Sequence, residues 1–91
     1  MNYKVVKYGA SWCHQCKMQD KEFEKNILKC PLYHVNIDEL EEEEIENLNL
    51  KSIPVTILYM CKDYSSVWTE LHRWIGFVKT DAINKIIEES N

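Results

Sequence analysis

The run Trp12-Cys13-His14-Gln15-Cys16 places two cysteines one helical turn apart, directly behind the apolar run Val5-Val6-Lys7-Tyr8. A Cys-x-x-Cys that opens a helix after a strand is typical of redox proteins. At a helix N-terminus, unpaired backbone N–H groups and the positive end of the dipole favour the charged, reactive form of a thiol. We therefore expect Cys13 to be the attacking thiolate and Cys16 to be the resolving thiol, lying further inward.

Length and composition limit the classes of protein to consider. The chain has 91 residues and a formal net charge of −4, which predicts a single domain over residues 1–91 with one modest core. It has no basic cluster to follow a nucleic-acid backbone, no apolar stretch near the ~20 residues that span a membrane, and no signal-peptide pattern at its start. We expect a cytoplasmic protein, a monomer, in a compartment where a Cys-x-x-Cys is more often catalytic or metal-binding than structural.

Apolar periodicity and turn residues predict an α/β order of elements, β-α-β-α-β-β-α. Strands are expected over 3–8, 32–37, 53–59 and 67–75, and helices over 13–28, 38–48 and from a cap at Thr80 or Asp81 to about 89. The first two strands should be parallel and the last two an antiparallel hairpin, giving a four-stranded mixed sheet flanked by helices. The apolar stripe of the first helix is expected to comprise Met18, Phe23, Ile27 and Leu28.

This order, with Cys-x-x-Cys at the first strand–helix junction, resembles the thioredoxin fold. Residues 10–18, ASWCHQCKM, are similar to the thioredoxin active-site run. Residues 52–56, SIPVT, resemble the cis-proline loop of the family, and residues 74–77, WIGF, resemble the late loop whose glycine lets a substrate chain approach. The leading strand and helix of a full thioredoxin are absent, so the resemblance implies a thioredoxin-like protein of minimal, glutaredoxin-like size.

The resemblance implies a thiol-disulfide oxidoreductase that reduces or exchanges protein disulfides through Cys13 and Cys16. It implies that substrates contact a rim formed by Trp12, Ile53, Pro54, Ile75 and Gly76, and a cis peptide bond before Pro54. Ile75 and Phe77 could belong to this rim or to the core. No bound cofactor is implied; electrons are expected from NADPH through a thioredoxin reductase, or from glutathione.

Several positions depart from the family pattern. The usual Gly-Pro between the cysteines is His14-Gln15, the buried Asp six residues before the first cysteine is Lys7, and its usual partner Lys aligns with His34. A buried Lys7 is costly unless it pairs with a carboxylate or its stem reaches solvent. If its ammonium lies near Cys16, it should favour that thiolate and raise the redox potential above the about −270 mV of thioredoxin, towards −200 to −230 mV.

Other readings stay open at the level of the sequence. His14 could stabilise the Cys13 thiolate as an imidazolium or be exposed without a role. The protein could be a dedicated electron donor to one enzyme such as ribonucleotide reductase, a metal or Fe–S module that uses Cys13 and Cys16, or a non-catalytic scaffold. Cys30 and Cys61 are expected to be small buried apolar residues, with a disulfide between them as the alternative.

Overall fold

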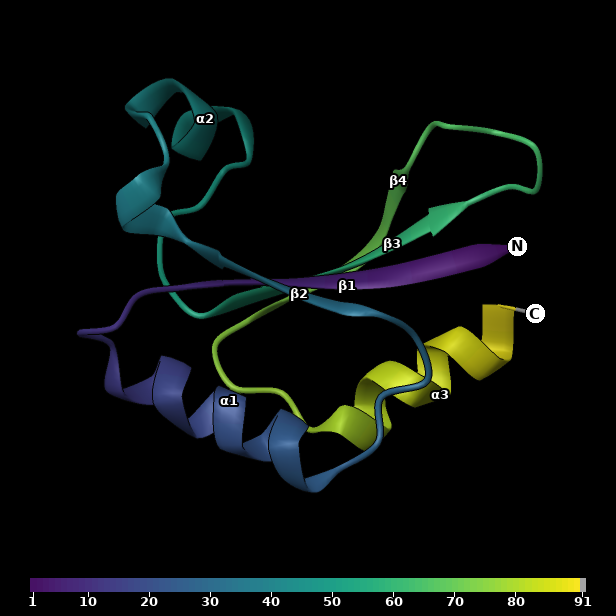
Figure 1. Ribbon diagram of the computed structural model, residues 1–91, viewed down its shortest axis with the longest axis horizontal. Helices are drawn as coiled ribbons and strands as arrows, with labels where there is room; N and C mark the ends of the chain where they lie inside the picture. The colour runs from purple at the N-terminus through teal and green to yellow at the C-terminus, as the bar shows by residue number, and fades with distance from the viewer. Residues whose placement is uncertain (91) are drawn as a thin grey trace.

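In the computed structural model, which describes residues 1–90, four strands form one mixed sheet in the order β2-β1-β3-β4 (Figure 1). β1 (Asn2–Gly9) is parallel to β2 (Leu32–Asn36) and antiparallel to β3 (Val55–Cys61), which forms a hairpin with β4 (Thr69–Ile75). The predicted mixed sheet, with its parallel first pair and its terminal hairpin, is confirmed.

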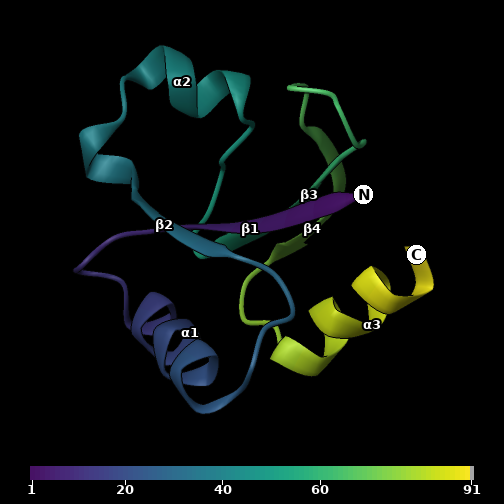
Figure 2. The same ribbon diagram turned by 45° about the vertical axis from the view of Figure 1, so that its right-hand side comes forward.

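Helices cover the two faces of the sheet unequally. α1 (His14–Lys25) and α3 (Thr80–Ser90) lie on one face, and the short α2 (Glu42–Asn47) lies on the other, as Figures 1 and 2 show. Neighbouring residues of β1 serve opposite faces: Val5 packs in the core under α1 and α3, and Val6 in the core under α2. None of the helices within residues 1–90 is both long and apolar enough to cross a membrane.

The buried stripe of α1 differs from the predicted one. Met18 is 45% exposed and Ile27 is 87% exposed, so both expectations were wrong, whereas Phe23 is buried. The helix ends at Lys25, and the extended backbone of Asn26 places Ile27 outside it. The inward face is formed by Cys16, Gln19 and Phe23, and a polar side chain therefore takes one position where the sequence pattern favoured apolar ones.

Two other helices also differ from expectation. The predicted helix over 38–48 is divided into a 3-10 turn, η1 (Ile37–Glu39), and α2. The turn begins at Asn36, whose side-chain oxygen accepts a hydrogen bond from the backbone N–H of Asp38. The start of α3 is held by α1 rather than by Thr80 or Asp81, since the Thr80 N–H donates to Oε2 of Glu22 at 2.8 Å.

Candidate functional site

The two cysteines lie at the N-terminus of α1. Cys13 is the N-cap residue, and its Sγ accepts a hydrogen bond from the Cys16 backbone N–H at 3.1 Å. The cysteines are joined in a disulfide with 5.2 Å between their Cα atoms. Cys16 is 1% exposed and Cys13 8%, so the expectation that Cys16 lies further inward is confirmed. Cys13 receives the N–H donation that stabilises a thiolate at this position.

Two residues beside the cysteines are exposed. His14 is the first residue of α1 and faces solvent, so its effect on Cys13 stays a prediction. Trp12 is also exposed, and its indole Nε1–H donates to Oδ2 of Asp38 at 2.9 Å. This hydrogen bond fixes a large apolar ring at the surface next to Cys13.

The loops of Pro54 and Gly76 meet at the same end of the sheet. The Ile53–Pro54 peptide bond is cis, as predicted, and Ile53 packs against the cluster of Ala10, Cys13 and Cys16. The Gly76 N–H donates to the Pro54 carbonyl oxygen at 2.8 Å, joining the two loops. A Cβ at Gly76 would lie 3.9 Å from Oε1 of Gln15, which places the Gly76 loop beside the first turn of α1.

Ile75 and Phe77 flank Gly76 and are exposed. The alternative of core packing for these two side chains is therefore wrong. Gly76 has a φ of 89°, a left-handed backbone conformation that glycine adopts without steric cost. Trp74, in contrast, points to the other side of the strand and packs against the core under α1 and α3.

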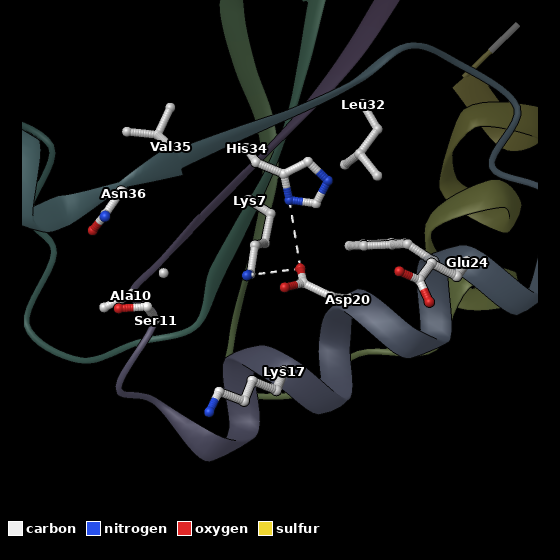
Figure 3. A pocket seen from close by; sticks show the side chains of 12 residues that line it. Lys7, Ala10, Ser11, Lys17, Asp20, Glu24, Leu32, His34, Val35 and Asn36 are labelled. Atoms are coloured by element: carbon white, nitrogen blue, oxygen red, sulfur yellow. Dashed lines mark hydrogen bonds and ion pairs between the residues drawn. The ribbon is translucent and has the colours of Figure 1, made fainter.

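Lys7 is buried in the central strand β1 and forms an ion pair. Its Nζ lies 2.8 Å from Oδ1 of Asp20 on α1, and Nδ1 of His34 on β2 lies 3.5 Å from the same oxygen (Figure 3). Of the two alternatives for a buried Lys7, pairing with a carboxylate is the one observed. Asp20 was missed from the sequence, although it follows Cys16 by four residues and so lies near the same face of the helix.

The Lys7 ammonium also lies near the Cys16 sulfur. A Cβ built at Gly9 would be 2.9 Å from Nζ of Lys7 and 3.0 Å from Sγ of Cys16. The two atoms are therefore within about 6 Å of each other, the range in which an opposite charge favours the charged form of a titratable group. This geometry is the one that the sequence argument on Lys7 required.

A cavity of about 480 Å³ opens beside this ion pair, between α1 and the strands β1 and β2 (Figure 3). Its polar lining includes Ser11, Lys17, Asp20, His34 and Asn36. No pattern in the sequence indicated it, because its lining residues come from separate segments that meet only in the folded chain.

The two remaining cysteines, Cys30 and Cys61, carry free thiols. Cys61 is buried and its thiol donates to the Ser65 carbonyl at 3.0 Å, and Cys30 is partly buried. Neither forms a disulfide with any residue from 1 to 90, and burial raises the pKa of the Cys30 thiol to about 11. Within the same residues, no three His, Cys, Asp or Glu side chains are grouped so that they could hold a metal ion.

Comparisons with known proteins agree with the fold and the cysteine site described above. The family model "Thioredoxin" matches residues 2–89. No curated protein matches the chain in sequence. A solved structure described as a malarial protein is 27% identical, with a TM-score of 0.73, over 98% of this chain and 97% of that one.

Two further solved structures are thioredoxins of malaria parasites. The thioredoxin of Plasmodium falciparum is 22% identical over 97% of this chain and 70% of its own, with a TM-score of 0.73. Thioredoxin-2 is described as a component of the malaria parasite protein secretion machinery. It is 26% identical over 97% of this chain and 82% of its own, with a TM-score of 0.70. Thioredoxins exchange thiols and disulfides without a bound cofactor. Because the family model spans nearly the whole chain and the Cys13–Cys16 pair lies at the N-terminus of α1, the chain belongs to the thioredoxin family.

Proposed function

We propose that this protein reduces or exchanges disulfide bonds in protein substrates through the Cys13–Cys16 dithiol. The observation that carries the proposal is the position of Cys13 at the N-cap of α1, where its sulfur accepts the Cys16 N–H at 3.1 Å. The joined loops of Pro54 and Gly76 lie beside it. A nucleophilic sulfur, a charge-stabilising helix end and an adjacent loop pair are what disulfide exchange requires.

The reaction proceeds in two exchanges. The Cys13 thiolate attacks one sulfur of the substrate disulfide, which forms a mixed disulfide and releases the other substrate sulfur as a thiolate. Cys16 then attacks Sγ of Cys13, which forms the Cys13–Cys16 disulfide and releases the second substrate thiolate. The pair is returned to the dithiol by two electrons from NADPH through a thioredoxin reductase, or, as the second choice, from glutathione.

Substrate contacts are proposed at the rim around Cys13. Trp12 and Ile75 are exposed there, and Ile53 is partly exposed. An extended substrate segment can pair with the backbone of Ile53 before Pro54, and Gly76 offers no side chain to block it. Lys7 is proposed to raise the redox potential above the about −270 mV of thioredoxin, and His14 to favour the Cys13 thiolate by its charge.

The protein is proposed to lie in the cytoplasm and to be a monomer. Cys30 and Cys61 are unpaired within residues 1–90, which supports a reducing compartment, because cytosolic thiols are kept reduced. Fractionation of cells and sedimentation of the purified protein test these two points.

The proposed function is tested by a redox titration in glutathione buffers, with free thiols alkylated and located by mass. Cys13 and Cys16 are expected to change together as one two-electron couple, while Cys30 and Cys61 stay reduced. Cys16→Ser should accumulate a mixed disulfide with a protein substrate, and Cys13→Ser should not. The proposal is wrong if Cys13 and Cys16 form no reversible disulfide, or if both react only after a metal is removed.

A further inference from the structure

Three charged groups form a line from the redox disulfide to the cavity. Starting at the sulfur of Cys16, the line passes to the Lys7 ammonium within about 6 Å, then to the Asp20 carboxylate, then to the His34 imidazole. Figure 3 shows the side chains of Lys7 and His34 pointing at the same carboxylate from two strands. Asp20 is therefore shared between one buried and one exposed basic group.

The three side chains differ in their exposure to water. Lys7 is 6% exposed, whereas Asp20 is 42% and His34 is 52% exposed. The charge of Lys7 is thus little screened and acts on the neighbouring sulfur, while Asp20 and His34 are reached from solvent through the cavity. Conditions in solution can therefore act on the exposed Asp20 and His34, and thereby change how strongly the Lys7 charge acts on the Cys16 sulfur.

We propose that Asp20 is the counter-charge that limits how strongly Lys7 stabilises a thiolate at Cys16. We also propose that protonated His34 weakens this counter-charge, so that the redox equilibrium of the Cys13–Cys16 pair is tuned by pH. The proposal rests on the proposed function, since it concerns the same disulfide. Asp20 and His34 act through Lys7 and are positioning residues for charge, not groups that touch the substrate.

The direction in which each substitution shifts the redox equilibrium follows from where negative charge develops when the disulfide is reduced. Two glutathione thiols supply two electrons to the Cys13–Cys16 disulfide and end as glutathione disulfide, and negative charge then develops at Cys16 when its thiol ionises. A positive charge at Lys7 favours this state, and a negative charge at Asp20 disfavours it. Removing the negative charge of Asp20 should therefore favour the dithiol, and removing the positive charge of Lys7 should favour the disulfide.

His34 supplies the dependence on pH. A histidine gains its charge within the range of pH 5 to 8, and a charged imidazole 3.5 Å from Asp20 offsets that carboxylate. Among the described residues that line the cavity, the other charged side chains are Lys17 and Glu24, both on α1. Neither residue type ordinarily changes charge in this range, so acidification alters the line of charges through His34.

The experiment measures the equilibrium constant with glutathione for four proteins at pH 6 and pH 8: the natural chain, Asp20→Asn, Lys7→Met and His34→Gln. Asp20→Asn keeps the size of the side chain and an oxygen that accepts from Lys7. It should shift the equilibrium towards the dithiol by about three- to fivefold at pH 8, and Lys7→Met should shift it about tenfold towards the disulfide. His34→Gln should leave the equilibrium at pH 8 unchanged and shift the equilibrium at pH 6 towards the disulfide by at most about twofold, in proportion to the fraction of Cys16 that is ionised there.

Controls separate charge from folding. Glu88→Gln breaks the exposed ion pair between Lys29 and Glu88, away from Cys13 and Cys16, and should leave the equilibrium unchanged at both pH values. Unfolding in urea reports the stability of each variant. His34 is exposed, so its variant remains a test if a substitution at the buried Lys7 unfolds the chain.

Two results would overturn the inference. One is an equilibrium for Asp20→Asn at pH 8 within about 1.5-fold of the natural chain, well short of the expected shift. The other is a shift of Asp20→Asn and Lys7→Met in the same direction. A natural chain that forms no reversible disulfide would overturn the proposed function as well. A natural chain that titrates normally while Asp20→Asn is unchanged would overturn this inference alone.

Discussion

At the scale of single residues, Gly9 keeps open the space between the Lys7 ammonium and the Cys16 sulfur. A Cβ there would lie 2.9 Å from Nζ of Lys7 and 3.0 Å from its Cε, closer than side-chain carbons normally approach. The end of a lysine side chain is flexible and can move aside. Gly9→Ala is therefore expected to displace the charge rather than the strand.

The expected effect of Gly9→Ala is a shift of the glutathione equilibrium towards the disulfide by about threefold, because the ammonium moves away from the sulfur. The same redox titration measures it, with the exposed Ser11→Ala as the control. If a folded Gly9→Ala protein has the equilibrium of the natural chain, the distance from Lys7 to Cys16 has no influence on the redox pair.

Trp12 gives a second prediction at this scale. Its ring is exposed beside Cys13 and is fixed by the hydrogen bond to Asp38. Trp12→Ala should lower kcat/KM for a protein disulfide by about tenfold, since exposed aromatic side chains dominate the energetics of docking. The rate with a small aromatic disulfide should change less than about twofold, because such a reagent needs no docking surface.

The matched control for Trp12 is Trp68→Ala, a tryptophan just before β4, at the end of that strand opposite Ile75. Trp68 contacts the Lys4 ammonium at 4.4 Å from its ring centre. Equal losses for the two variants, or equal losses with protein and small disulfides, would rule out docking at Trp12.

At the scale of elements, α1 is tied to the Gly76 loop by one buried side chain. Gln19 is fully buried, its Nε2 donates to the Val78 carbonyl at 2.8 Å, and its Oε1 accepts from the Val78 N–H at 2.8 Å. The helix that carries the cysteines is therefore fixed to the segment that follows Gly76. Replacing this glutamine by an apolar side chain leaves a buried N–H and a buried C=O without these partners.

Gln19→Met, which conserves length, should lower the free energy of unfolding by about 2–3 kcal/mol. Urea unfolding followed by tryptophan fluorescence measures this value. Gln15→Met, the same substitution at an exposed site on the same helix, should change it by less than about 0.5 kcal/mol. A loss at Gln19 no larger than that at Gln15 would mean that the pair of hydrogen bonds contributes little.

At the scale of the whole molecule, two acidic groups, the buried Tyr8 and the partly buried Cys30, predict a loss of stability in alkali. Burial raises the pKa of Cys30 from 9.0 to about 11. Burial, and then the hydroxyl of Tyr59 at 3.5 Å, raise the pKa of Tyr8 well above its ordinary value. Since the unfolded chain releases these protons first, the stabilisation from Cys30 is complete below about pH 9 and is lost as the pH rises through 9 to 11. The stabilisation from Tyr8 begins to be lost only above its ordinary pKa of about 10.

The free energy of unfolding should therefore fall by about 2 kcal/mol between pH 8.5 and 11 because of Cys30, with a further loss from Tyr8. Urea unfolding of the oxidised protein in oxygen-free buffer measures the decline. Cys30→Ala and Tyr8→Phe should each flatten the curve, and the exposed Tyr33→Phe should not. A flat curve for the natural chain would contradict the assignment of both groups.

Local sequence patterns were enough to predict the order of strands and main helices and the location of the redox pair. The apolar residues of β1 pack on both faces of the sheet, and Cys13 and Cys16 are one turn apart at the start of α1. The resemblance added the cis bond at Pro54, which no local pattern shows.

Which side chains surround the redox pair depends instead on how distant segments pack in the folded chain. Asp20 and His34 meet at Lys7 because α1 packs across the parallel strands β1 and β2, and Gln19 is buried because the loop after Gly76 brings it the Val78 backbone. Periodicity favours apolar residues on an inward face, so a polar partner supplied by a distant segment leaves no trace in it. The charges near Cys16 depend on how α1, β1 and β2 pack together. A local sequence pattern does not encode that packing.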